Sequence, residues 1–262
     1  MKKVLSIAGS DSSGGAGIQA DLKTFHKFGV WGLTVITSLT AQNTKGVVET
    51  IPINSDFVYK QIEAIATDIK VDAVKIGMLL TKENVLVVSK AIENFSLKNV
   101  VLDTVLISKN GKELLSKDGI ELLKEYLIPK VDLITPNIPE AETLINSKIE
   151  SVEDMKKACL ELKKLGVKNV LLKGGHLKNS EMALDILYYN GEFFEFSFPY
   201  IKGVHPKGTG CTLSSAIASL MAKGFDLKSS VEVAKTFITG AIKTSFRIGE
   251  GNPVLNFWFA DK

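Results

Sequence analysis

The sequence predicts one α/β domain with a mostly parallel sheet, helices on both faces of that sheet and an antiparallel hairpin at one edge. Short apolar runs alternate with longer stretches of helical periodicity along most of the chain, which is the pattern of parallel strands joined by helices. Two strand-like runs at residues 183–189 and 192–198 flank Asn190-Gly191, a strong signal for a hairpin turn. No linker, repeat or low-complexity tract interrupts residues 1–262, so a single domain is expected.

The individual strands and helices follow in order along the chain. Short runs rich in aliphatic and β-branched residues predict buried strands at residues 4–8, 33–40, 47–53, 73–77, 100–105, 131–135 and 170–173. Apolar residues at helical spacing predict helices at residues 17–28, 55–68, 82–93, 119–127, 139–145, 152–165, 209–222 and 229–246. Gly29 and Gly166 are expected to end two of these helices, and Ser55 to cap the start of another.

Composition and charge exclude several classes of protein. The net charge of +3 is too small to indicate a nucleic-acid partner by itself. The two cysteines, Cys159 and Cys211, form neither a disulfide framework nor a metal-ligand spacing, so reduced thiols are expected. No apolar run approaches the roughly 18 residues that span a bilayer. We therefore expect a cytoplasmic enzyme or binding protein that contacts neither nucleic acid nor membrane.

Polar segments follow the predicted strands. In open parallel sheets, ligands bind at the carboxyl ends of the strands. Segments with glycine, amide or carboxylate residues lie at these ends, at residues 9–17, 42–43, 77–78, Asp103, 137–140 and 174–176. Because parallel strands share one carboxyl edge, we expect these segments to meet there and to form the functional site.

The sharpest local feature is the start of the helix predicted near residue 209, in the sequence Lys207-Gly208-Thr209-Gly210-Cys211-Thr212. A helix N-terminus concentrates unpaired N–H donors and partial positive charge, so it binds anions readily. Such a position lowers the pKa of a thiol from about 8.5, and Cys211 would then accept a proton from a substrate hydroxyl. The alternative is that Cys211 is a small residue that fits a crowded helix start.

Three further candidates follow from residue chemistry. The carboxamide of Gln42 suits the edge of an aminopyrimidine, or else it bonds to local backbone. Asp103 and Glu140 offer carboxylate oxygens, which Mg²⁺ takes as ligands beside nucleotide phosphates. The alternative for Glu140 is that a glutamate stabilises the first turn of a helix electrostatically. Lys173 ends a strand and could meet phosphates as a point charge. Arg247 is the single arginine, so phosphate binding must rest mainly on lysines and backbone amides.

A dinucleotide site is disfavoured. Residues 15–20 match the fingerprint G-x-G-x-x-A between a strand and a helix. However, the preceding loop is longer than the fingerprint's tight turn, and the acidic residue expected about 20 positions later is absent. The alternative is that the glycines of residues 9–17 let the backbone approach a small planar ligand closely.

Together these segments resemble the hydroxymethylpyrimidine/phosphomethylpyrimidine kinases of thiamine biosynthesis, within the ribokinase-like superfamily. The matching motifs run in order through nearly the whole chain, at residues 7–11, 13–25, 39–44, 74–78, 102–105, 134–141, 173–176 and 208–214. The resemblance implies a three-layer α/β/α sandwich and MgATP-dependent phosphorylation of 4-amino-5-hydroxymethyl-2-methylpyrimidine and then of its monophosphate. Members often form dimers, so a homodimer is one expectation.

The resemblance also implies roles for individual residues. Gln42 would bind the pyrimidine edge, and the remaining substrate-binding residues would be Gly9, Ala16, Asp21, Met78 and Val105. Mg²⁺ and phosphate would be held by Asp103, Asn137 and Glu140. The transferred phosphoryl group would be met by Lys173, by an anion hole at Gly208, Thr209 and Gly210, and by Cys211 in the place of the catalytic base.

The chain departs from the family pattern just before this anion hole. It reads His205-Pro206-Lys207-Gly208 where members usually read Asn-Thr-His-Gly, so a lysine stands in the place of a histidine.

Three alternative functions stay open. One is a pyridoxal kinase of the same branch, because pyridoxal is also a planar heteroaromatic hydroxymethyl compound. Another is a non-catalytic pyrimidine-binding protein. The third is a cysteine hydrolase, whose base would be His26, His176 or His205.

Overall fold

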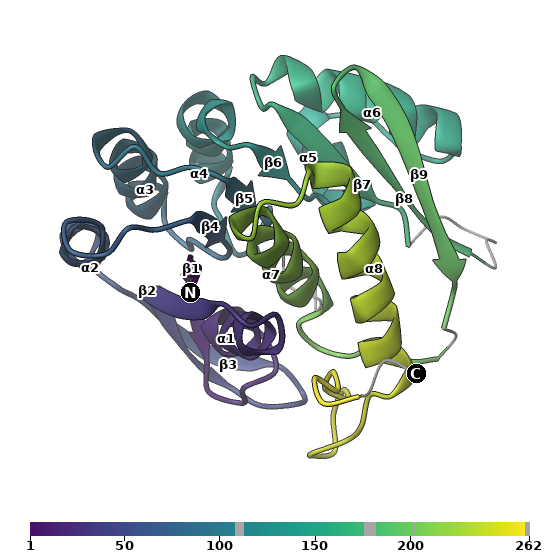
Figure 1. The fold of residues 1–262 in the computed structure, drawn as a ribbon, viewed down its shortest axis with the longest axis horizontal. Coiled ribbons are helices and arrows are strands. Elements are labelled where there is room, and N and C mark those ends of the chain that lie inside the picture. Colours follow the sequence, from purple (N-terminus) through teal and green to yellow (C-terminus); the bar gives the residue numbers. More distant parts are fainter. Residues whose placement is uncertain (108–112, 176–181, 202, 260–262) are drawn as a thin grey trace.

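The computed structural model describes residues 1–107, 113–175, 182–201 and 203–259, and it has the predicted sandwich architecture (Figure 1). In these residues a nine-stranded sheet has the order β3-β2-β1-β4-β5-β6-β7-β8-β9. The strands are β1 (Lys3–Asp11), β2 (Trp31–Gln42), β3 (Val47–Pro52), β4 (Ala73–Ile76), β5 (Val100–Leu102), β6 (Leu133–Ile134), β7 (Asn169–Lys173), β8 (Met182–Tyr189) and β9 (Glu192–Pro199). The six strands from β2 to β7 in this order run parallel.

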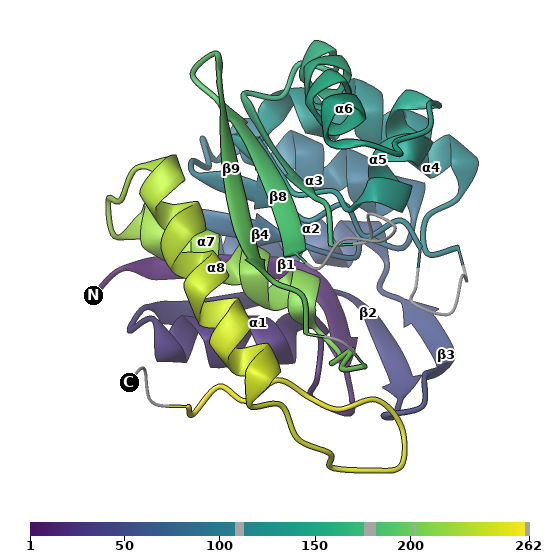
Figure 2. The ribbon, with the colours of Figure 1, turned by 90° about the vertical axis from the view of Figure 1, so that its right-hand side faces the viewer.

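Helices cover both faces of the sheet (Figures 1 and 2). One face carries α1 (Gly17–Lys27), α7 (Thr209–Ala222) and α8 (Leu227–Lys243). The other face carries α2 (Ser55–Ala66), α3 (Lys82–Asn94), α4 (Lys117–Leu122) with its short extensions η1 (Leu123–Leu127) and η2 (Ile128–Lys130), α5 (Ile138–Ile145) and α6 (Val152–Lys164).

The core therefore has two halves, one on each side of the sheet. Val4 packs with α1, α7 and α8, whereas its neighbour Leu5 packs with α2 and α3. Successive strand residues point to opposite faces, so a strand with both faces buried must be apolar throughout. This is the reason that the central strands read as continuous apolar runs in the sequence.

Both edges of the sheet are antiparallel, although the sequence predicted only one such edge. The predicted hairpin is confirmed as β8–β9, with φ of 51° at Asn190 and 84° at Gly191. At the other edge β2 pairs antiparallel with β3, because the connection at residues 43–46 is too short for a crossover helix. Asn43 Oδ1 shapes this turn by accepting the amides of Lys45 and Gly46 at 2.8 and 3.2 Å.

Several boundaries differ from the prediction, among them the start of α2, the end of β5 and the end of α8. Asn54 rather than Ser55 caps α2, since its side chain accepts the Asp56 amide at 2.9 Å. β5 ends at Leu102 instead of residue 105, which frees Asp103 from the sheet. α8 ends at Lys243 and not at residue 246, because Phe246 pairs with Val254 in the segment that follows. Within the described ranges, no helix is both long enough and apolar enough to cross a membrane.

Candidate active site

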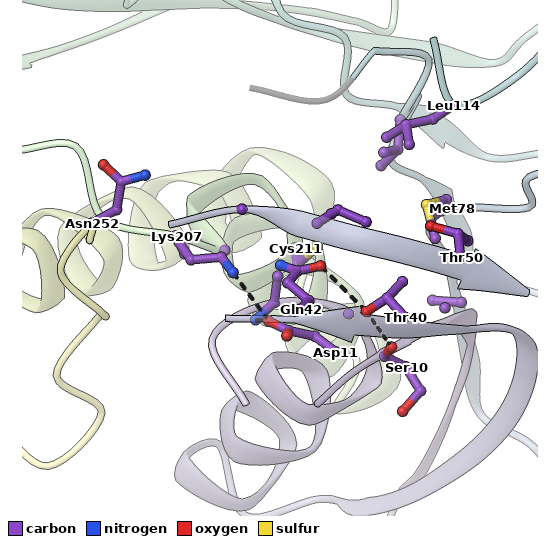
Figure 3. Close-up of a pocket in the computed structure, with 18 of the residues that line it drawn as sticks. Ser10, Asp11, Thr40, Gln42, Thr50, Met78, Leu114, Lys207, Cys211 and Asn252 are labelled. Carbon is purple, nitrogen blue, oxygen red and sulfur yellow. Dashed lines mark hydrogen bonds and ion pairs between the residues drawn. The ribbon is translucent and has the colours of Figure 1, made fainter. Parts of the chain in front are cut away.

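A cavity of about 240 Å³ lies at the carboxyl ends of β1 and β2, where α1 and α7 begin (Figure 3). Its lining combines apolar groups with a few polar ones, as small-molecule sites do. Residues that the sequence singled out contribute much of this lining, namely Gly9, Ala16, Gln42, Met78, Val105, Gly208 and Cys211. The tertiary structure thus brings together segments that lie far apart in the chain.

Two glycines allow the close packing around this cavity. A Cβ on Gly9 would come within 2.6 Å of Met78 Cε. Gly208 has a φ of 78°, and a Cβ there would collide with the Gly15 carbonyl oxygen. The start of α7 therefore rests directly on the loop before α1, and only glycine fits this contact.

The first turn of α7 presents free amides. Gly208 is the N-cap and offers no side-chain cap, and the first intrahelical bond runs from the Thr212 amide to the Gly208 carbonyl at 2.9 Å. For the amides of Thr209, Gly210 and Cys211, no acceptor is found in the described part of the chain. The helix starts at the predicted residue, and its open N-terminus is suited to an anion.

A second polar cluster lies at the ends of β5, β6 and β7. Lys173 Nζ is 3.0 Å from Asp103 Oδ1, which also accepts the Thr135 hydroxyl at 3.1 Å. This cluster adjoins α7, because a Cβ on Gly210 would lie 3.1 Å from Asp103 Oδ2 and 3.4 Å from Lys173 Nζ. The free amides of α7 are therefore flanked by the cavity on one side and by this carboxylate and lysine on the other.

Asn137 and Glu140 have a structural role in this cluster. Each side chain accepts the other's backbone amide at 2.9 Å, forming a capping box at the start of α5. Glu140 Oε2 also accepts the Thr104 hydroxyl at 3.1 Å. Glu140 therefore lies in the first turn of α5, as the alternative of helix electrostatics expects, and a metal-binding role would have to coexist with the capping box.

Burial and neighbouring charges set the protonation of the cluster. Burial raises the pKa of Glu140 to about 7, and the Asp103 charge acts in the same direction while Lys173 opposes it. Burial also acts to lower the pKa of Lys173, but the charges of Asp103 and Glu140 outweigh it and raise that pKa. Lys173 is therefore a permanent cation beside the free amides.

The expected lowering of the Cys211 pKa is wrong. Burial raises the pKa of this thiol, and the positive charge of Lys75 and the Gly17 amide oppose burial only in part. The helix N-terminus is present as expected, but desolvation of a thiolate outweighs it.

The structure does not bring Asp21 to the cavity. Its side chain is fully buried, and its carboxylate receives bonds from Ser6, Lys75 and Ser215 at 2.6 to 2.9 Å. Sequence reasoning missed Lys75, whose side chain is also fully buried. The available signal was a lysine inside the otherwise apolar strand at residues 73–76.

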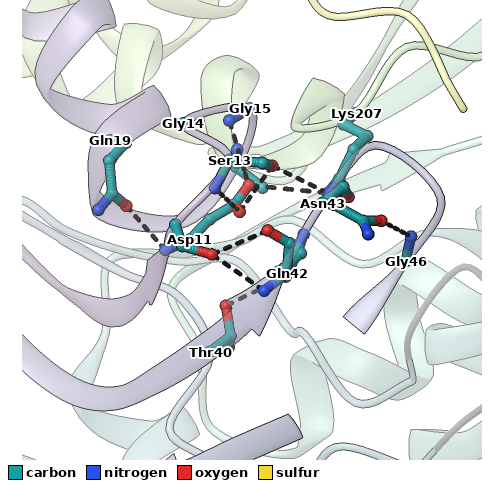
Figure 4. A network of polar contacts seen from close by, with 12 residues as sticks. Asp11, Ser13, Gly14, Gly15, Gln19, Thr40, Gln42, Asn43, Gly46 and Lys207 are labelled. Carbon is teal, nitrogen blue, oxygen red and sulfur yellow. Dashed lines mark hydrogen bonds and ion pairs between the residues drawn. The ribbon is translucent and has the colours of Figure 1, made fainter. Parts of the chain in front are cut away.

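Lys207 ties three segments together around the cavity (Figure 4). Its Nζ donates to the Asn43 carbonyl at 2.7 Å and to Ser13 Oγ at 3.3 Å, and it lies 3.8 Å from Asp11 Oδ2. The Asp11 carboxylate itself accepts the amides of Gly15 and Ala16. Lys207 thus holds the loop before α1 and the β2–β3 turn beside α7.

The C-terminal segment adds a residue that the sequence did not indicate. Asn252 lines the cavity, and its backbone N–H donates to the Thr44 carbonyl at 2.9 Å. No local pattern in residues 244–259 gave a signal for this placement, because it depends on contacts with the β2–β3 turn.

Neither of the two histidines that the structure describes, His26 and His205, lines the cavity beside Cys211. His26 is exposed on α1, and among the described lining residues of the cavity there is no histidine. His176 lies outside the described residues. The two described histidines therefore give no support to a cysteine hydrolase.

Known proteins match the chain over nearly its full length. The family model for phosphomethylpyrimidine kinase matches residues 11–256. A hydroxymethylpyrimidine/phosphomethylpyrimidine kinase from Aquifex aeolicus is 48% identical over 253 residues, which cover 97% of this chain and 99% of that relative.

Two solved structures are similar as well. A phosphomethylpyrimidine kinase from Clostridium difficile has a TM-score of 0.83 at 47% identity, covering 92% of this chain and 100% of that one. An ADP complex of Bacillus subtilis pyridoxal kinase has a TM-score of 0.90 at 37% identity, covering 98% and 97%. The predicted ribokinase-like fold is confirmed, and the chain belongs to the phosphomethylpyrimidine kinase family.

Proposed function

We propose that the protein transfers the γ-phosphoryl group of ATP to the hydroxymethyl group of 4-amino-5-hydroxymethyl-2-methylpyrimidine, and then phosphorylates the resulting monophosphate, in the biosynthesis of thiamine diphosphate. The observation that carries this proposal is the open first turn of α7, which separates the cavity from the Lys173–Asp103 pair. A substrate hydroxyl in the cavity and a phosphate at these amides would be neighbours. The names of the relatives support the choice of substrate.

In this proposal the cavity orients the pyrimidine. The Gln42 carboxamide pairs with the amino and ring-nitrogen edge of the substrate. Ala16, Met78 and Val105 contact the faces of the ring, and they exclude water from it. Gln42 is suited to this role because Ser12 fixes its backbone. The Ser12 hydroxyl accepts the backbone N–H of Gln42 at 2.9 Å and donates to the backbone carbonyl of Gln42 at 2.8 Å.

Phosphoryl transfer then needs positioning and charge stabilisation more than covalent chemistry. The substrate oxygen forms a bond to the γ-phosphorus, the bond from that phosphorus to ADP breaks, and the hydroxyl proton passes to the Cys211 thiolate. The amides of Thr209, Gly210 and Cys211 would bind the oxygens of the moving group. Lys173 would contribute its positive charge to the same oxygens.

We further propose Mg²⁺ as the metal that accompanies ATP. Within the described residues, no group of three or more His, Cys, Asp or Glu side chains encloses a metal position. The acidic groups fit the usual Mg²⁺ arrangement, in which one or two carboxylates act together with water and substrate phosphates. Asp103 and Glu140 would hold the ion, which would neutralise phosphate charge; the capping box with Asn137 places Glu140 for this role. Relief of the mutual repulsion of these carboxylates would favour its binding.

A substrate panel tests this function. Purified protein with MgATP is given the hydroxymethylpyrimidine, its monophosphate, pyridoxal, pyridoxine or ribose, and each product's phosphate count is read by mass spectrometry. We expect the diphosphate from both pyrimidines. Conversion of pyridoxal alone would favour the pyridoxal kinase alternative, which the similarity to the Bacillus subtilis enzyme keeps in view. ATP consumption without a phosphorylated product, or no consumption at all, would contradict kinase activity.

A cytoplasmic location and a homodimeric state remain predictions for this protein. Fractionation of the producing cells and light scattering of the purified protein test them directly.

A further inference from the structure

A fully buried ion pair lies beneath the catalytic end of α7. Lys75 on β4 and Asp21 on α1 each have a side chain with 0% exposure, and Lys75 Nζ is 2.9 Å from both carboxylate oxygens of Asp21. Neither side chain lines the cavity. The function proposed above does not use either residue.

Asp21 connects the pair to the two helices that begin at the cavity. Its Oδ2 accepts the Ser6 hydroxyl of β1 at 2.6 Å, and its Oδ1 accepts the Ser215 hydroxyl of α7 at 2.7 Å. Asp21 lies one helical turn after Gly17 in α1, and Ser215 lies one turn after Cys211 in α7, so each shares a face with the cavity residue of its own helix. One carboxylate thus joins the second turns of α1 and α7, one turn after the cavity residues Gly17 and Cys211.

Lys75 also influences the Cys211 sulfur. Three charged groups act on this thiol, namely Lys75 of β4, Asp21 of α1 and Asp103 just after β5, and the effect of Lys75 is the largest of the three. The same coupling is found from the other side, because Cys211 is among the groups that raise the pKa of Lys75. Two further cations stand near the first turn, Lys173 beside Gly210 and Lys207 just before Gly208.

The backbone is shaped around this lysine. A Cβ on Gly77 would lie 2.8 Å from Lys75 Nζ, so a glycine leaves room for the amine just before the cavity residue Met78. A buried ion pair is in general not required for stability, because apolar residues of similar volume often serve equally well. A pair built into four elements at the substrate site therefore calls for a functional explanation.

We propose that Lys75 and Asp21 are positioning residues for Cys211: Lys75 supplies the positive charge that favours the thiolate, and Asp21 fixes that charge and holds α7 one turn after Cys211. The catalytic value of this positioning rests on the proposed function, in which Cys211 receives the substrate proton. The effect on the thiol itself does not depend on that function.

The two charges predict changes of opposite sign. Lys75→Met removes the cation and leaves the thiolate less favoured, so the alkylation of Cys211 by iodoacetamide at pH 7.5 should slow. Asp21→Asn removes the anion and leaves Lys75 facing the thiol, so the alkylation should speed up. A change of one unit in the thiol pKa alters the thiolate fraction about tenfold, and we expect a change of that order in each direction. Loss of structure alone would move both variants the same way.

The measurement follows alkylation by mass of the Cys211 peptide across a pH series. Reading that peptide separates Cys211 from Cys159, whose pKa burial raises to about 12. The double variant Asp21→Asn/Lys75→Met removes both charges at nearly constant volume and should react at a rate between those of the single variants. If Lys75→Met does not fold, comparison of Asp21→Asn with the double variant gives the effect of Lys75 in a neutral background.

A second buried pair provides the matched control. Lys235 Nζ of α8 is 2.7 Å from Asp185 Oδ2 of β8, and both residues are buried, but neither is among the groups that act on Cys211. Lys235→Met and Asp185→Asn should leave the thiol reactivity unchanged. Shifts of the same sign in the two test variants, or no shift in either, would overturn the positioning role. A normal thiol response in a protein that fails the substrate panel would instead place the error in the proposed function.

Discussion

Gln42 and Cys211 show how two side chains from distant parts of the sequence come to share one cavity. Gln42 is the last residue of β2, and Cys211 lies in the first turn of α7. One is an amide that suits a planar polar edge, and the other is a thiol beside free backbone donors. Their separate roles in the proposed reaction lead to separate predictions.

Replacement of Gln42 by leucine should weaken binding of the aminopyrimidine and spare MgATP. The loss should be about 1–3 kcal/mol, since polar groups of the substrate would be left unpaired. Titration calorimetry with each ligand alone measures both affinities. Asn94→Leu, an exposed amide on α3 that bonds to Tyr59, is the control and should change neither affinity. Equal losses for the two ligands would contradict the role of Gln42.

The pH dependence of the reaction should report on Cys211. Burial raises the pKa of this thiol, so the thiolate is populated only on the alkaline side of the ordinary value of about 8.5. We expect kcat/KM to rise with pH into that range. Cys211→Ser should remove this alkaline rise and retain a rate reduced by about 10²–10⁴-fold, the usual contribution of a general base. A serine variant with an unchanged pH profile would show that Cys211 does not carry the proton.

At the scale of elements, the site depends on how α1 and α7 meet. Both helices begin at the cavity, and the carbonyl of Gly15 contacts the backbone of Gly208 at their junction. Helix N-termini carry partial positive charge, so two of them directed at one region make it favourable for phosphate. The buried Asp21 bonds beneath this junction hold the two helices in register.

Gly208→Ala should therefore impair activity more than its backbone strain alone explains. Gly208 has a φ of 78° and a Cβ there collides with Gly15, whereas Gly224 at the other end of α7 has a φ of 92° and an open surrounding. Gly224→Ala is the control. Alanine in a left-handed conformation costs about 1 kcal/mol, and Gly208→Ala and Gly224→Ala share this cost. Only Gly208→Ala must also displace the first turn of α7. Thermal unfolding of the two variants measures the backbone strain, and kcat/KM measures the effect of displacing the turn. Equal activity losses in the two variants would contradict a role of the α1–α7 junction in catalysis.

At the scale of the whole molecule, the carboxyl edge of the sheet concentrates charge that burial makes costly. Glu140 is the clearest case, because its folded pKa of about 7 lies above the ordinary value of 4.5. The folded state holds a proton in a window where the unfolded chain has released it. The free energy of unfolding should therefore fall as the pH rises from about 4.5 to 7 through this group.

Glu140→Gln tests this linkage without loss of the helix cap, since glutamine also serves at this capping-box position. The variant should show a flatter stability profile between pH 5 and 7 and be more stable than the parent at pH 8 by about 1–3 kcal/mol. Urea unfolding at several pH values measures it. Glu142→Gln on the same helix is the control. A bond from the Ile149 amide lowers the pKa of Glu142, so Glu142 makes a contribution to the pH dependence of stability that is opposite in sign to that of Glu140. An unchanged slope in Glu140→Gln would contradict the assignment.

Local sequence was sufficient for much of the fold. Continuous apolar runs in the central strands, the Asn190-Gly191 turn and the glycine-rich start of α7 each act over a few residues, so the sequence determined them directly. The second antiparallel edge was missed because the short connection after β2 is decided by pairing between β2 and β3 and not by periodicity. The cap of α2 at Asn54 was one residue from its expected place for the same reason: only geometry shows which side chain reaches the amide.

The sequence by itself determined which polar residues follow the strands and where α7 begins. Only the tertiary structure decided that Asp21 is buried with Lys75, that Lys207 joins three loops and that Asn252 reaches the cavity. These contacts join residues that are far apart in the chain. Burial, which reverses the expected pKa shift of Cys211, is likewise a property of packing around a group and is absent from its local sequence.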